Sequence, residues 1–148
     1  MRRFSNCVTI IGIAVAAAGC GKNDGLLRTR CQVVKGDEAF VTPEDHHLQI
    51  EFVPVIKPGE RLKRGMCYAC DVNQATGEFR PDGPMKTGMP PGKYQVVLAL
   101  LDENKKDVFG GKFDGENSPF IFEVDEDTDE IVIDLDDPPA QLQASAGG

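Results

Sequence analysis

The sequence has no tryptophan, two tyrosines and two histidines among its 148 residues. Carbohydrate-binding proteins use exposed aromatic side chains as platforms, and Tyr68 and Tyr94 both fall in expected strands. A hydrolase with a serine or cysteine nucleophile needs a base beside it, most often a histidine. Only His46 and His47 are available for that role. We therefore expect a protein that is not an enzyme.

Positive charge is also scarce. The chain has 16 Lys and Arg residues against 24 Asp and Glu residues, which gives a formal net charge of −8 at pH 7. Nucleic-acid binding requires a basic surface that displaces counterions from the phosphates. We therefore expect no nucleic-acid partner. One basic segment, Lys57–Arg64, stands out and could dock an anionic polymer or partner, although a solvated loop is the ordinary interpretation.

Long apolar runs are missing too. The longest, from Val8 to Ala18, covers about 11 residues, whereas a membrane-spanning helix needs roughly 20. It follows the basic residues Arg2 and Arg3 and precedes the small residues of Ala17–Cys20. Basic, apolar and small residues in this order are typical of a cleavable secretory signal peptide.

The end of this segment resembles the lipobox of exported bacterial lipoproteins, with Ala17 where the family more often has leucine. The resemblance implies that residues 1–19 are removed and that the Cys20 thiol takes up a lipid, with palmitate among its acyl chains. Two or more acyl chains anchor a protein stably to a membrane. Gly21 favours the outer membrane over the inner one by the same resemblance. An ordinary signal peptide with a free Cys20 is the alternative.

The rest of the chain has the length of one domain. Residues 21–25 are polar and glycine-containing, so we expect a lipidated tether over residues 20–27. Residues 28–137 form the expected domain, and residues 138–148, rich in Pro, Ala and Gly, form an expected disordered tail. Because Arg2 and Arg3 leave with the signal peptide, the net charge of the remainder is about −10, as suits a domain that stands off an anionic membrane.

Alternating apolar and polar residues recur along the domain, and no stretch of ten or more residues has helical spacing. Leu48–Val55 is the clearest strand, and Pro54 marks its end or a sheet edge. Tyr94–Leu101 has apolar residues on both faces, which predicts a central strand. Further expected strands are Arg28–Val34, Met66–Val72 and Glu78–Arg80, and a hairpin of Phe120–Val124 with Ile131–Leu135 around the acidic turn Asp125–Glu130. About seven strands predict an all-β fold, an antiparallel β-sandwich.

Three segments in this order suggest a family: Ile50–Pro54, Ala75–Phe79 and Gly88–Val96. They resemble small exported bacterial lipoproteins with a transthyretin-like, carboxypeptidase-regulatory-like domain, related to the Ig-like and prealbumin-like sandwiches. In Ala75–Phe79 the glycine of Thr-Gly-Glu-Phe is expected to need a positive φ, before an aromatic residue that re-enters the core. The segment Pro-Gly-Lys-Tyr within Gly88–Val96 is expected to do the same.

The resemblance implies a spacer or a binding module. The chain departs from the family in its first strand, where Arg30–Gly36 lacks a Val-x-Gly pattern. It also lacks the Tyr-Arg-Gly-Ser terminus of transthyretin-related hydrolases, which removes the most specific enzymatic interpretation of this fold.

Cys67 and Cys70 form a C-x-x-C motif, which can be a redox dithiol, half of a metal site or part of a haem attachment. Haem attachment is excluded because Asp71, not histidine, follows. A thioredoxin-type site needs the first cysteine at a helix N-terminus, and no helix is expected here. On an extended strand the two residues lie about 10 Å apart on opposite faces, beyond the roughly 7 Å limit of a disulfide.

Cys31 in the first strand could instead bridge to either of the two. An exported protein occupies an oxidising compartment, where disulfides persist. A structural disulfide is therefore the leading interpretation of these cysteines. A redox site, a Cys/His metal site and unpaired core thiols are the alternatives.

Weaker metal candidates remain. His46 and His47 could join a cysteine around zinc. Asp125, Asp127 and Asp129 alternate like the start of a calcium loop, but position six is not glycine and flanking helices are absent, so an EF-hand is excluded. A solvated turn is the ordinary interpretation, and we expect no resident metal or cofactor.

Together these observations predict a cell-envelope lipoprotein, anchored to the membrane through Cys20, with its domain facing the periplasm or the exterior. Its β-sandwich would be a non-catalytic structural or binding module with an envelope protein or polymer as partner. The alternative is a redox or metal-handling lipoprotein that uses Cys67 and Cys70.

Overall fold

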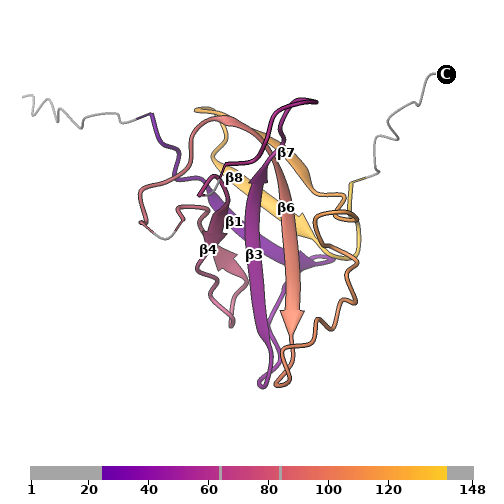
Figure 1. Ribbon diagram of the computed structural model, residues 1–148. Coiled ribbons are helices and arrows are strands. Elements are labelled where there is room, and N and C mark those ends of the chain that lie inside the picture. The colour runs from indigo at the N-terminus through magenta and orange to yellow at the C-terminus, as the bar shows by residue number, and fades with distance from the viewer. Residues whose placement is uncertain (1–24, 64, 84, 140–148) are drawn as a thin grey trace, which may run out of the picture.

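The computed structural model describes residues 25–63, 65–83 and 85–139 (Figure 1). The expected signal peptide 1–19, the expected lipidation site Cys20, the start of the tether and residues 140–148 of the expected tail lie outside these ranges. The described residues contain eight strands and no helix. Accordingly, no helix among them is long and apolar enough to cross a membrane.

The strands agree with the predicted ones to within a few residues, and the all-β prediction is confirmed. Their bounds are β1 Arg30–Lys35, β2 Glu38–Ala39, β3 His47–Pro54, β4 Tyr68–Cys70, β5 Glu78–Phe79, β6 Gly92–Leu101, β7 Ile121–Val124 and β8 Glu130–Asp134. β2 was not predicted, because two residues are too short to carry an alternating pattern. β3 ends at Pro54, as expected.

The strands form two sheets of four. In the second sheet the order is β4-β3-β6-β7 and every pairing is antiparallel. In the first sheet β1 pairs with β2 and β5 on one edge and with β8 on the other. Figure 1 shows β3 and β6 in front of β1 and β8, so the sheets are two layers, as a β-sandwich requires.

Two expectations about pairing are wrong. The pairing of β1 with β8 is parallel, from Arg30 opposite Glu130 to Val34 opposite Asp134. The predicted hairpin does not form, because β7 pairs with β6 and β8 belongs to the other sheet. The acidic turn carries the chain from one layer to the other. A hairpin and a crossing between layers need the same local sequence, two apolar strands around a polar turn, so the pattern could not distinguish them.

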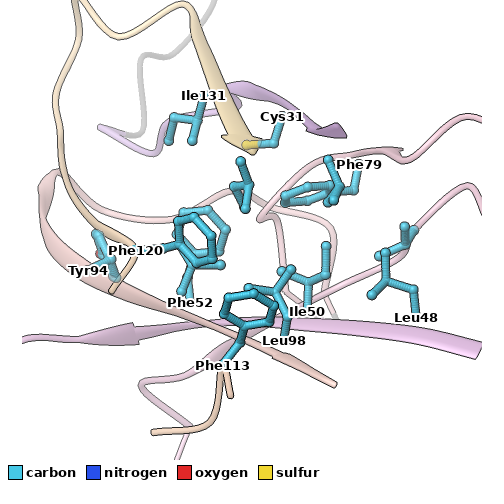
Figure 2. Close-up of a cluster of buried hydrophobic side chains, with 14 of the residues drawn as sticks. Cys31, Leu48, Ile50, Phe52, Phe79, Tyr94, Leu98, Phe113, Phe120 and Ile131 are labelled. Atoms are coloured by element: carbon cyan, nitrogen blue, oxygen red, sulfur yellow. The ribbon is translucent and has the colours of Figure 1, made fainter. Parts of the chain in front are cut away.

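One hydrophobic core lies between the layers (Figure 2). β1 and β8 contribute Val33 and Ile133 to it, both 0% exposed. β3 contributes Phe52, whose ring centroid lies 6.2 Å from that of Phe79 on β5, in the opposite sheet. β6 is a central strand, as predicted, with alternate residues buried and the others half-exposed.

The two glycine turns of the sequence differ. Gly77 has φ +71°, and the following Phe79 is buried, as expected. Gly92 already belongs to β6 and has no positive φ. Pro90 and Pro91 direct the chain there instead, because the proline ring fixes φ near −65°.

Candidate functional site

The structure places Cys31 and Cys70 on the inside of the sandwich and Cys67 elsewhere. Cys31 on β1 is 3% exposed, and Cys70 on β4 packs against the same core cluster. Cys67 precedes β4 in a bend and is half-buried. Alternation along β4 turns Ala69, and Cys67 with it, toward the outer face. The two cysteines of the C-x-x-C motif therefore face different sides of the sheet, as the sequence predicted. All three cysteines are thiols in this structure.

Burial raises the pKa of every one of these thiols. The pKa of Cys31 rises from 9.0 to about 12 through desolvation, with a smaller contribution from the Glu130 carboxylate. Desolvation also raises the pKa of Cys70, and Cys31 is the next contributor. The pKa of Cys67 is raised by desolvation and then by Glu51. A redox or nucleophilic cysteine needs a lowered pKa, because the thiolate is the reactive form. These surroundings favour structural thiols.

The reduced, folded protein should react with an alkylating reagent at Cys67 first. At pH 8 we expect Cys31 and Cys70 to react slower than Cys67 by a factor on the order of 100 or more, because both are buried and rarely ionised. Timed quenching and peptide mass spectrometry give the three rates. In denaturant the rates should converge, which is the control. A fast Cys70 in the folded protein would contradict this assignment.

A hollow with a volume of about 370 Å³ and a largely charged lining lies beside Cys31. Cys31 and Phe79 form its buried floor, and exposed or half-buried polar residues surround them. The cations of this rim are Arg30, Arg80 and Lys86, and its carboxylates are Asp71, Glu78, Asp82 and Glu130. The Lys86 Nζ lies 3.6 Å from the Asp71 carboxylate, and their side chains are 70% and 84% exposed. Such an exposed ion pair stabilises the fold by only about 0–1 kcal/mol.

The sequence did not predict this hollow. Its cations come from β1 and from the segment after β5, about 50 residues apart, and only the β1–β5 pairing brings them together. The lining of the hollow thus carries both signs of charge. Burial and the Glu130 carboxylate raise the pKa of the Cys31 thiol in its floor, so this thiol is kept protonated.

The two histidines are separated. His47 belongs to β3 and is exposed on the outer face of its sheet. His46 is half-buried, and its Nδ1 has no hydrogen-bond partner in this structure. The Gln74 side chain fixes this segment to the turn before β5: its Oε1 accepts from the Leu48 N–H at 2.8 Å and its Nε2 donates to the Leu48 carbonyl at 3.1 Å.

In the acidic turn Asp125–Glu130, the Asp125 carboxylate accepts hydrogen bonds from residues of the turn itself. The Asp125 Oδ1 accepts from the Thr128 hydroxyl at 2.7 Å and from the Asp127 N–H at 3.1 Å. Asp127 and Asp129 are exposed. In residues 25–63, 65–83 and 85–139, no group of three or more His, Cys, Asp or Glu side chains is placed to hold a metal ion. The weak metal candidates of the sequence, His46, His47 and these aspartates, are therefore not brought together. The basic residues Lys57, Arg61 and Lys63 are exposed on the loop between β3 and β4.

The strongest features of this domain are thus a pair of inward-facing cysteines and a mixed-charge hollow above one of them. Compared with protein-family models, with curated proteins and with solved structures, the chain matches none.

Proposed function

We propose that this protein is a bacterial cell-envelope lipoprotein, anchored through a lipidated Cys20, whose β-sandwich is a non-catalytic structural or binding module. The observation that carries the proposal is the segment that ends in Ala17–Cys20, followed by one all-β domain whose first strand begins at Arg30. A signal peptide, a short polar tether and a single domain are the parts that an anchored lipoprotein needs. We favour the outer membrane because Gly21 follows the lipidated residue.

The domain itself would be of the transthyretin-like, carboxypeptidase-regulatory-like kind. Two four-stranded sheets around one core support this, as do the positive φ of Gly77 and the burial of Tyr94, since both belong to the segments that carry the resemblance. The non-catalytic role is supported by the raised pKa values of the thiols. An envelope protein or polymer would be the partner, and the hollow beside Cys31 is the first surface to probe.

Changing Cys20 to alanine tests the anchor. We expect the full-length chain, expressed in a bacterial host, to incorporate labelled palmitate and to sediment with the membrane, and the C20A variant to lose both properties completely. Two acyl chains bind a bilayer far more strongly than a polar domain does. Fluorography and membrane fractionation measure the outcome.

Cys7 provides the matched control. It is the other cysteine of the N-terminal segment and would leave with the signal peptide, so C7A should be labelled and fractionate like the unchanged chain. Label that persists in C20A, or label that depends on Cys7, would contradict the proposal.

A further inference from the structure

We propose that Cys31 and Cys70 form a disulfide that joins the two sheets across the core, and that Cys67 remains a thiol. The inference rests on the proposed export, because a disulfide persists in an oxidising compartment. The inference goes beyond the sequence analysis, which allowed Cys31 to pair with either Cys67 or Cys70.

The two cysteines belong to opposite sheets but to the same part of the core. Cys31 on β1 stands opposite Phe79 on β5, and the Phe79 ring contacts Phe52 on β3. Phe52 in turn stands opposite Tyr68, two residues before Cys70 on β4. Figure 2 shows Cys31 beside Phe79 and Ile131 at the rim of the buried cluster. The side chains of Cys31 and Cys70 thus reach the same core cluster from opposite sheets, both near the contact of Phe52 with Phe79.

The hollow gives a second sign of their proximity. It is lined by Cys31 together with Asp71, the residue next to Cys70, and with Asp82, which also acts on the pKa of Cys70. The charge of an ionised Cys31 contributes to the raised pKa of Cys70, as expected for neighbouring thiols.

Neither thiol has a strong competing partner. The Cys31 Sγ lies 3.8 Å from the Thr29 carbonyl and the Cys70 Sγ lies 3.5 Å from the Tyr68 carbonyl, each two residues earlier in the chain. Sulfur is a weak donor, so little is lost when these contacts break.

The other pairings conflict with the fold. Cys67 and Cys70 face opposite sides of β4. Cys67 lies near Glu51, a residue of the outer face, so the second sheet stands between it and Cys31. A bridge from Cys67 to either residue would require the edge strand to turn over.

Formation of the bond removes two electrons and two protons, and a disulfide-donating oxidant would accept the electrons. One cysteine thiolate attacks the donor disulfide, whose S–S bond breaks and releases one donor sulfur as a thiolate. The second cysteine thiolate attacks the protein sulfur of this mixed disulfide and releases the other donor sulfur. Both released sulfurs take up the protons that the cysteines lost. Because folding raises the pKa of both thiols, the exchange is fastest before the sheets close, and closure then shields the bond.

Peptide mapping of the exported chain tests the pairing. The full-length protein is alkylated in the cell, purified without reductant and digested. Trypsin releases Cys31–Lys35 and Gly65–Lys86, because the Arg80–Pro81 bond resists cleavage, and chymotrypsin, cutting after Tyr68, separates Cys67 from Cys70. We expect Cys31 linked to Cys70, and Cys67 alkylated without prior reduction. In the C67S variant the bridge should persist, and reduction should lower the melting temperature by roughly 10–15 °C.

A second arm separates this inference from the proposed anchor. The same full-length chain is refolded from denaturant with oxidised glutathione as the disulfide donor, and the expected product is again Cys31–Cys70, whatever the state of Cys20. A bridge from Cys67 to either residue, or three free thiols in this arm, would overturn the inference. Loss of palmitate labelling with an intact Cys31–Cys70 bridge would instead count against the anchor alone.

Discussion

Replacing Phe52 with alanine is expected to lower the free energy of unfolding by about 3–5 kcal/mol. The Phe52 side chain is 0% exposed, and its ring centroid lies 6.2 Å from those of both Phe79 and Tyr94. The substitution leaves a cavity between the two sheets, because the aromatic rings around it come from different strands and cannot all move inward. Since a domain of this size is stable by about 5–15 kcal/mol, most of the stability would be lost.

Urea unfolding of the two proteins, followed by circular dichroism, measures this difference. Val132→Ala is the matched control, because Val132 lies on β8 but is 50% exposed, and its truncation should change the stability by no more than about 0.5 kcal/mol. A cost below about 1 kcal/mol for Phe52→Ala would mean that Phe52 does not join the two layers as described.

Gly77→Ala is expected to cost about 3 kcal/mol, well above Gly36→Ala at about 1 kcal/mol. The two glycines have similar backbone angles, φ +71° and +64°. A Cβ at Gly77 would lie 2.7 Å from the Val33 carbonyl oxygen and 3.0 Å from that of Phe40, whereas a Cβ at Gly36 meets nothing within 4 Å. Only Gly77→Ala therefore has to displace backbone, that of Val33 in β1 and that of Phe40, which follows β2.

The pair separates two effects that a single glycine substitution mixes. Gly36→Ala reports the cost of the left-handed conformation, and the difference between the two variants reports the close approach of the turn to β1. The Gly77 carbonyl accepts a hydrogen bond from the Val33 N–H at 2.9 Å, so a displaced turn also weakens the β1–β5 pairing. Chemical denaturation at one pH gives both values, and equal costs would refute the close approach.

The sequence was sufficient to locate most strands because burial in this domain alternates strictly along them. In β3, Leu48, Ile50 and Phe52 are buried and the residues between them are not, and this alternation can be read without a structure. The pairing of β8 could not be read in the same way. Ile131 and Ile133 require a buried face, but either sheet offers one, and the choice depends on which edge is open after the other strands have paired.

Part of the candidate site could also be predicted from the sequence, because it depends on the same alternation of buried and exposed residues. Alternation separated Cys67 from Cys70, since this statement concerns one strand at a time. That Cys70 is the neighbour of Cys31 depends on how two sheets are stacked, which no local pattern contains. The hollow above Cys31 depends on the same stacking and on the exposed residues Arg80 and Lys86, which have no distinctive motif.

The parallel pairing of β1 with β8 ties the beginning of the domain to its end. The Thr29 hydroxyl donates to the Thr128 carbonyl, 99 positions later, and the five paired positions that follow close one edge of β1. A chain that emerges from the ribosome at about 5–20 residues per second must wait several seconds for that partner. During this interval the first sheet lacks β8, and the part of the core that β8 covers is exposed to solvent. For a chain exported unfolded, as proposed above, this delay keeps the first sheet open until β8 has been synthesised.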